Sequence, residues 1–288
     1  SNTALAVGPG IDYVFVRTFN PYSGELEIVV MAKARMNAYC PEKNAALAFA
    51  DYKKGDKDIP FEVLAECKGK DLVGYSYEQL MNFVSPMGNA FKVIGGDYVT
   101  TEDGTGIVHI APTFGADDDR VAKQAGIVPL FVVDKAGKNQ PMVDRQGKFF
   151  KIEDLDETFV KNYVNQEAYK EYAGRFVKNA YDNKLTEKDP TLDVDLSVLL
   201  KQQGKAFKIE KHVHNYPHCW RTDKPILYYP LDSWFIKTTA IKDRLIELNK
   251  TINWKPEATG SGRFGNWLEN LVDWNLSRSR YWGTPLPI

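Results

Sequence analysis

The amino-acid sequence predicts an α+β fold, in which an irregular β-barrel with packed helices is followed by a β-ribbon and a further helical segment. The barrel is predicted because residues 1 to about 150 hold many short runs rich in Val, Ile, Phe and Tyr, separated by turn clusters such as NPYSGE and DKAGKN. The packed helices are predicted because apolar residues take three- and four-residue spacing from about residue 153 to 204.

The individual elements follow from these patterns. Runs of β-branched and aromatic residues predict strands over residues 4–7, 12–19, 26–36, 61–69, 97–111 and 126–134. Helical periodicity predicts helices over 159–173 and 194–204, and the second ends at Gly204, a residue type common after helix C-termini. Later in the chain, two strand-like pieces and one helix are expected over 211–221, 225–237 and 241–250.

The tryptophans indicate how the chain is organised. All six lie in its last quarter, from Trp220 to Trp282, which marks a structural unit different from the one before it. We therefore expect a main domain over residues 1–210, a β-ribbon connector over 211–238 and a helical segment over 239–288.

Charge, cysteine usage and hydropathy narrow the class of protein. The 37 Lys and Arg against 38 Asp and Glu give a net charge of −1, so a nucleic-acid partner would have to be held by a local patch. The three cysteines, Cys40, Cys67 and Cys219, form no Cys-x-x-Cys pair, which is typical of a reducing compartment such as the cytoplasm. No apolar run approaches the roughly 20 residues that span a bilayer, so we expect a soluble protein without a membrane partner.

The stretch GTGIVHIAPTFGADDD, residues 104–119, holds the first candidate site. Its glycines fit neither a Gly-x-Gly-x-x-Gly fingerprint nor a P-loop, so a phosphate cradle is not indicated. Strand alternation predicts that Val108 and Ile110 share one face and that His109 lies on the other. The three aspartates at 117–119 predict the start of a helix, where acidic side chains are favoured. Two interpretations are open: helix-starting acids with a packed histidine, or a carboxylate that anchors an ammonium group beside His109.

The segment HVHNYPHC invites a zinc interpretation. A structural zinc site needs four ligands, and no Cys or His follows Cys219, so we predict packed histidines and no metal site. Between Lys201 and Lys224, six Lys and Arg stand against two acids and alternate with aromatic residues. Such a stripe either follows a phosphate backbone or is a solvated face. No Ser-His-Asp or Cys-His arrangement for covalent catalysis can be assembled from local spacing.

Three motifs, in this order and spacing, resemble one family: GTGIVHIAPTFGADD, NYPHCWRTDKPILYYPLDSWFIK and DWNLSRSRYWGTPLPI. Together they resemble the isoleucyl-tRNA synthetases, specifically the editing insertion of these class I aminoacyl-tRNA synthetases and the helical return segment toward their Rossmann catalytic domain. The resemblance covers essentially the whole chain. The leucyl enzymes differ at residues 108–112 and the valyl enzymes at residues 281–284. The synthetic signatures His-Ile-Gly-His and Lys-Met-Ser-Lys-Ser are absent from the 288 residues, so the resemblance implies a fragment that edits and does not aminoacylate.

What the resemblance implies is hydrolysis of valine attached in error to isoleucine tRNA. A synthetic pocket can reject an amino acid one methylene smaller by only ~1 to 3 kcal/mol, so a second pocket must destroy the wrong product. By their match to the family's motif, Asp118 binds the α-ammonium of valine and His109 lies by the terminal adenosine and the ester, and these two are the expected catalytic residues. The expected substrate-binding residues are Asn2, Gly104, Thr105, Gly106, Thr113 and Phe114.

The resemblance also sets the expected partners and cofactors. It implies the mischarged 3′ end of isoleucine tRNA as the partner of a monomeric protein, with no metal or cofactor for editing, because ATP and Mg serve only the catalytic domain. A water attacks the ester, oriented by the site and by the ribose hydroxyl. In the family a threonine-rich strand, one wall of the editing pocket, precedes the Ser-Asn pair that matches Ser1 and Asn2. The alternatives are therefore an inert tRNA-contacting fragment, or the editing domain of a valyl- or leucyl-tRNA synthetase.

Overall fold

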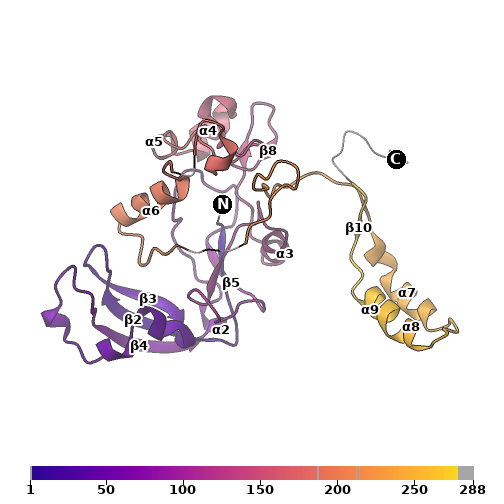
Figure 1. The fold of residues 1–288 in the computed structure, drawn as a ribbon, viewed down its shortest axis with the longest axis horizontal. Helices are drawn as coiled ribbons and strands as arrows, with labels where there is room; N and C mark the ends of the chain where they lie inside the picture. Colours follow the sequence, from indigo (N-terminus) through magenta and orange to yellow (C-terminus); the bar gives the residue numbers. More distant parts are fainter. Residues whose placement is uncertain (1, 187, 212, 214, 278–288) are drawn as a thin grey trace. The chain divides into compact units, whose positions relative to one another are not determined.

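The structure, a computed structural model, describes residues 2–186, 188–211, 213 and 215–277. It consists of two compact units, residues 1–230 and 231–288, and the second is described as far as residue 277 (Figure 1). The boundary between the units lies inside the connector that we expect over residues 211–238.

The first sheet of the first unit positions the candidate site. Its order is β5–β1–β6, in which β1 (Ala4–Val7) runs parallel to β5 (Lys92–Gly95) and antiparallel to β6 (Ile107–Ile110). One face packs against helix α3 (Ala116–Gln124), because small and branched side chains of the strands form a buried cluster with Ala122. Since β6 is an edge strand, its outer backbone edge pairs with no other strand among the described residues.

The second sheet of this unit is antiparallel. In it β2 (Asp12–Phe19) lies between β3 (Leu26–Ala32) and β4 (Phe61–Lys68), side by side in Figure 1. One face is buried against helix α1 (Met36–Tyr39) and the thiol of Cys40. Strands β2 and β4 confirm the runs predicted over 12–19 and 61–69 nearly residue for residue, whereas the run predicted over 26–36 forms a strand only as far as Ala32, where helical turns begin. Burial alternates clearly along β2, as expected for the middle strand of the sheet.

The predicted irregular β-barrel is wrong for the described residues, whose strands form separate open sheets, although the α+β class is confirmed. The two larger sheets meet at a corner. There the buried hydroxyl of Tyr13 accepts a hydrogen bond from the amide of Gly8 at 3.0 Å and donates to the carbonyl of Gly106 at 2.6 Å. The amide of Ala32 donates to the carbonyl of Thr105 at 2.8 Å. A barrel needs continuous ladders between edge strands, whereas single bonds between a loop and a strand hold this corner.

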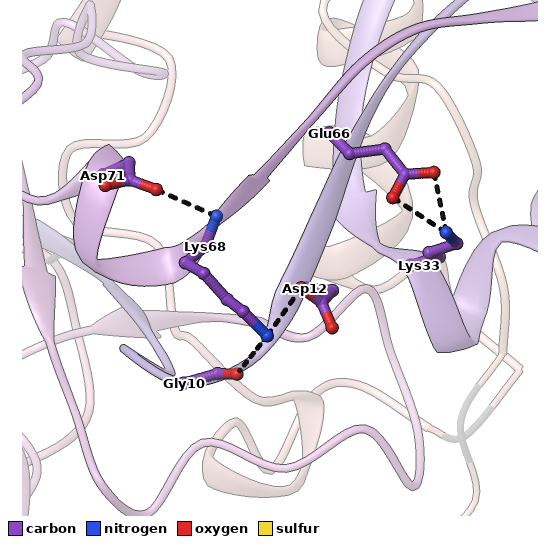
Figure 2. Close-up of polar contacts among 6 residues, drawn as sticks. All are labelled: Gly10, Asp12, Lys33, Glu66, Lys68 and Asp71. Atoms are coloured by element: carbon purple, nitrogen blue, oxygen red, sulfur yellow. Dashed lines mark hydrogen bonds and ion pairs between the residues drawn. The ribbon is translucent and has the colours of Figure 1, made fainter.

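Charged side chains fasten the start of β2 to the end of β4 (Figure 2). The Lys68 ammonium lies 2.7 Å from an Asp12 carboxylate oxygen, and the Lys68 amide donates to the Asp71 carboxylate at 3.0 Å. Beside them the Lys33 ammonium contacts both carboxylate oxygens of Glu66, at 2.7 and 2.8 Å. Because the paired side chains are about half exposed, they set the geometry of the junction more than its stability.

Two short helices replace the single helix predicted over 159–173. Helix α4 (Glu157–Tyr163) ends before Val164, and Asn165 is the N-cap of α5 (Gln166–Tyr169). The side chain of Asn165 accepts a hydrogen bond from the amide of Ala168 at 3.2 Å. Asparagine is a favoured N-cap residue, so a new helix starts after Asn165. The spacing of the apolar residues continues across this position and does not reveal the interruption.

Helix α6 (Leu192–Gln202) confirms the helix predicted over 194–204. Thr191 caps it by accepting a hydrogen bond from the amide of Val194, and Gly204 follows with φ of +68°. With α4 and α5 it packs around a separate core whose buried members are Phe83, Val84, Leu130, Val132, Met142, Leu155, Phe159, Val160, Tyr169, Tyr172 and Leu192.

Short elements complete the first unit. Helix α2 (Gly69–Leu72) follows β4, and β7 (Val132–Val133) pairs with β8 (Asn139–Gln140). Strand β7 is all that forms of the run predicted over 126–134, and β6 is all that forms of the run predicted over 97–111.

The second unit is a small helical arrangement. Helix α7 confirms the helix predicted over 241–250, and the strand-like piece over 225–237 forms only a two-residue strand. The unit's elements are β9 (Phe235–Ile236), α7 (Lys242–Asn249), α8 (Ala258–Ser261), α9 (Arg263–Glu269) and β10 (Trp274–Asn275), with β9 antiparallel to β10. The end of the motif DWNLSRSRYWGTPLPI lies outside the described residues.

Candidate functional site

The candidate site is built where β6 ends and α3 begins. The three aspartates at 117–119 lie in the first turn of α3, as the sequence predicts. Asp118 is partly buried, and its Oδ2 accepts a hydrogen bond from the amide of Ala111 at 2.8 Å. The carboxylate is therefore held against the end of the strand, and its other oxygen makes no hydrogen bond with a described residue.

The neighbouring aspartates are used differently. Asp117 pairs with Arg120 at 3.1 Å, and its side chain is 92% exposed, so its charge is largely solvated. Asp119 pairs with Lys123 at 2.6 Å along the helix surface. Neither these side chains nor that of Asp118 caps the helix, whose N-cap residue is Gly115. Asp118 is thus the acid of the three whose carboxylate is directed to the loop between β6 and α3.

His109 lies on β6 and is exposed. The register pairs it with Leu5, while Ile110 pairs with Ala4 in the cluster under α3, which confirms the predicted alternation of the two faces. The imidazole makes no hydrogen bond with another described residue. Two residues of a strand span about 7 Å, so a ligand lying along the free outer edge of β6 can reach both His109 and Asp118.

Asn2 lies at the same end of the sheet as Asp118, because the amide of Thr3 donates to the carbonyl of Ile110 at 2.9 Å. Its Oδ1 accepts a hydrogen bond from the hydroxyl of Tyr77 at 2.5 Å. Burial raises the pKa of Tyr77 to about 12, while the bond to Asn2 acts in the opposite direction. The hydroxyl therefore stays protonated at neutral pH and keeps the asparagine side chain in place.

Thr113 and Phe114 shape the loop between β6 and α3. The Thr113 side chain is buried and its hydroxyl donates to the carbonyl of Leu130 at 3.0 Å, so it ties the loop to the core near Asn2. The amide of Phe114 donates to the carbonyl of Ala111 at 3.0 Å. Beside Asn2 and Leu130 lies a cavity of about 100 Å³ with a mainly apolar lining, which includes Phe83, Val84, Met142, Phe149 and Leu196.

The turn of residues 104–106 lies at the opposite end of β6. A strand of four residues spans about 13 Å, so the structure does not bring this turn together with Asp118. Gly104 accepts a hydrogen bond from Arg35 Nε at 3.0 Å, and the next two carbonyls bond to the second sheet at the corner described above. Gly104 and Gly106 have φ of +57° and +74°, the left-handed region that glycine adopts readily. The geometry assigns these residues to the corner, and their contact with substrate stays a prediction.

Tyr98 belongs to the surroundings of Asp118, although the sequence patterns do not point to it. Burial raises the pKa of Tyr98, the Asp118 charge raises it further, and the charge of Arg120 lowers it, so the phenol lies near both side chains. It lines an open groove of about 690 Å³ between the segment after β5 and α3. The run DYVTT reads as a strand in the sequence, and only the unforeseen pairing of β5 with β1 brings Tyr98 to α3.

The described residues contain no group of three or more His, Cys, Asp and Glu side chains arranged to hold a metal ion. Of the zinc candidates, His212 and His214 lie outside the described residues. Cys219 begins a tight turn, where the Thr222 hydroxyl and the amides of Arg221 and Thr222 lower the pKa of its thiol. Across the described part of the chain, no helix has the length and apolar character required to cross a membrane.

With the geometry in place, the comparisons with known proteins identify the class. Residues 15–288 match the family of class I tRNA synthetases (I, L, M and V), and the chain belongs to this family. Within it, the isoleucine–tRNA ligase of Bacteroides fragilis is 67% identical over 288 residues, and that of Porphyromonas gingivalis is 60% identical over 289 residues. Each match covers 100% of this chain and 25% of the relative, so the chain spans about a quarter of their length. The predicted resemblance is thereby confirmed.

A solved structure is also similar to part of the chain. The editing domain of P. knowlesi cytosolic leucyl-tRNA synthetase matches over 43% of this chain and 47% of its own, with 19% sequence identity and a TM-score of 0.29. A TM-score this low supports no conclusion about the fold or the site.

Proposed function

We propose that this chain is the editing part of an isoleucine–tRNA ligase and that it hydrolyses the ester joining valine to isoleucine tRNA. The observation that carries the proposal is Asp118, whose carboxylate has one oxygen held by the amide of Ala111 and the other unbonded among the described residues. The relatives at 60% and 67% identity are isoleucine–tRNA ligases, which favours this activity over the valyl and leucyl alternatives.

In this proposal Asp118 selects the substrate by its charge. The α-ammonium of an aminoacyl ester donates charge-assisted hydrogen bonds to the free carboxylate oxygen, which fixes the adjacent carbonyl carbon at the end of β6. His109, on the exposed edge strand, contacts the adenosine or the ester. A water then attacks the carbonyl carbon, the bond between that carbon and the ribose oxygen breaks, and the ribose oxygen takes a proton. The products are valine and free tRNA.

The side chain of valine is selected by size. We place it in the apolar cavity beside Asn2 and Leu130, which has a volume of about 100 Å³. The second pocket hydrolyses only products that are small enough to enter it, so the extra methylene of isoleucine keeps the correct product out by its size. In this arrangement Asn2 lines the pocket for the valine side chain, and Thr113 positions the loop beside it.

Partners and cofactors follow from the same proposal. The partner is the mischarged 3′ end of isoleucine tRNA, and the protein acts in the cytoplasm as a monomer. Ester hydrolysis by an oriented water needs no metal or organic cofactor in this scheme, while ATP and Mg serve aminoacylation in the remainder of the longer ligase.

The test is release of valine from Val-tRNA(Ile) by the chain and its Asp118→Asn variant. The asparagine side chain can still accept the hydrogen bond from the Ala111 amide, so the loop keeps its geometry, but the negative charge is lost. A hydrogen bond to a charged group contributes about 1.5 to 3 kcal/mol, so we expect a fall of about 10- to 150-fold in kcat/KM. Asp117→Asn removes the same charge one residue away, from a solvated side chain, and should leave the rate unchanged.

The outcomes separate the alternatives. Equal rates for the two variants would remove Asp118 from the mechanism. Valine release by the unmodified chain rules out the inert tRNA-contacting fragment. No release by the chain, followed by release once the family's threonine-rich segment is restored before Ser1, would support that inert alternative.

A further inference from the structure

A row of aromatic and basic side chains in the first unit lies outside the site above. In three pairs a cation lies 4.3 to 4.5 Å from the centroid of an aromatic ring. We call these six residues the cation–aromatic row: Lys148 over Phe176, Lys178 over Tyr216 and Arg221 over Trp220.

The first two pairs are neighbours in the fold. Lys148 and Phe176 face each other in an antiparallel bridge, and the amide of Val177 donates to the carbonyl of Gly147 at 2.8 Å. Lys178 follows immediately and reaches the ring of Tyr216. Backbone bonds therefore hold the segments around 148 and 176 together, and the side-chain contact of Lys178 with Tyr216 joins the segment around 216 to them.

The third pair lies on a hairpin that begins at Tyr216. The amide of Cys219 donates to the carbonyl of Lys224 at 2.8 Å, which closes the turn that carries Trp220 and Arg221. The hairpin is fastened to the rest of the unit, because the hydroxyl of Tyr181 donates to the carbonyl of Ile226 at 3.1 Å. Trp220 is nevertheless 84% exposed. A well-held turn that presents a tryptophan to solvent offers a partner a flat apolar surface.

The cations of the row carry charge that no described carboxylate neutralises. Lys148, Lys178 and Arg221 form no ion pair with another described residue. By contrast, Lys208 and Arg175 also lie over rings, but each has a carboxylate partner. The row thus offers positive charge at each of its three pairs and an exposed aromatic ring at Trp220, while Phe176 and Tyr216 are partly buried.

The structure also divides the basic stripe between Lys201 and Lys224. Lys201 lies over the ring of Tyr22 at 4.7 Å, and Lys208 pairs with Glu210 at 2.8 Å. The first half of the stripe is thus engaged with other parts of the unit, while Arg221 belongs to the row. The stripe does not form one continuous track, and the row crosses it at the hairpin.

We propose that the cation–aromatic row binds an unpaired segment of RNA, with phosphates at Lys148, Lys178 and Arg221 and a base stacked on Trp220. Single-stranded nucleic acid binds where cations without a carboxylate partner lie beside aromatic rings, because the cations attract its phosphates and the rings stack with its bases. We take this RNA to be an unpaired segment of tRNA, and this part of the proposal rests on the proposed function. A protein covering Trp220 is the competing interpretation.

The experiment measures equilibrium binding of uncharged isoleucine tRNA to the chain at several salt concentrations by fluorescence anisotropy. Trp220→Ala should weaken binding about 5- to 150-fold, the range for loss of one base–aromatic stack. Lys178→Gln should lower the slope of log K against log salt by about 0.7, the value for one phosphate contact to a single strand. Trp220→Ala should leave that slope unchanged.

Two variants elsewhere in the unit serve as matched controls. Tyr75→Ala removes an aromatic side chain that is 65% exposed, and Lys201→Gln removes a lysine that lies over a ring without an ion pair. Both should bind tRNA as the unmodified chain does. Equal affinities for the Trp220 and Tyr75 variants would overturn the proposal and favour a protein partner. Because the tRNA carries no amino acid, the result is independent of ester hydrolysis. The proposal for the row can fail while Asp118→Asn still slows editing, and the reverse.

Discussion

Replacing Gly106 by alanine tests whether the turn of residues 104–106 holds the corner between the two sheets. Gly104 and Gly106 both have left-handed φ, +57° and +74°, and an L-residue in that region costs roughly 1–2 kcal/mol. At position 106 a Cβ would also lie 2.5 Å from the Cβ of Ala32, so backbone or side chain must move. At position 104 a Cβ meets nothing within 4 Å. Overpacking adds about 1–3 kcal/mol, so we expect losses of about 1–2 kcal/mol for Gly104→Ala and about 2–5 kcal/mol for Gly106→Ala.

The assay is urea unfolding of the chain and of the two variants, followed by far-ultraviolet circular dichroism. Both substitutions carry the same backbone penalty and add the same single methyl group, so the difference between their unfolding free energies isolates the contact with Ala32. The expected difference is about 1–3 kcal/mol. Equal losses for the two variants would show that the corner accommodates a methyl group at Gly106 without cost and that the contact with Ala32 does not constrain the turn.

Two further predictions concern titratable groups. Iodoacetamide should alkylate Cys219 at lower pH than Cys40, because the Thr222 hydroxyl lowers the pKa of the first thiol and burial raises that of the second to about 11; mass spectrometry that finds equal rates contradicts this. The amide of Lys138 is the largest cause of a lowered pKa at Asp134, so this carboxylate contributes stability at neutral pH that is lost as the pH falls through the lowered pKa, below about 4. Hydrogen-exchange protection factors, which correct for the pH dependence of the intrinsic exchange rate, should therefore fall across β7 and β8 below that pH, and an Asp134→Asn variant should not show this fall.

Much of the fold could be predicted from local patterns, and the exceptions have physical reasons. Strands β2 and β3 are long, rich in β-branched and aromatic residues, and joined by a turn cluster, so their signal is strong. Strand β5 has four residues ending in Gly95, and it pairs in parallel with β1, far away in the sequence. Such a strand gives neither an alternation signal nor a hairpin signal. The number of strand-like runs likewise predicts a barrel, but it does not reveal which strand edges pair with each other.

The candidate site shows the same division between local and long-range information. Three consecutive acids predict the start of α3 from the helix dipole and its free amides alone. The sequence does not reveal that Asp118 turns back to the amide of Ala111, because that depends on the path of the loop between β6 and α3. Nor does it reveal that Gly104 lies at the far end of β6, since a contiguous motif says nothing about which end of a strand each residue occupies.

The most direct test of the proposed site is a crystal structure of the chain with a non-hydrolysable analogue, valine joined by an amide bond to the ribose of adenosine. The account predicts that the α-ammonium nitrogen lies within hydrogen-bond distance of Asp118, about 2.7–3.2 Å, with the adenosine along the outer edge of β6 beside His109. An analogue bound with its ammonium group on another side chain, and with no contact to Asp118, would rule out this role for the carboxylate.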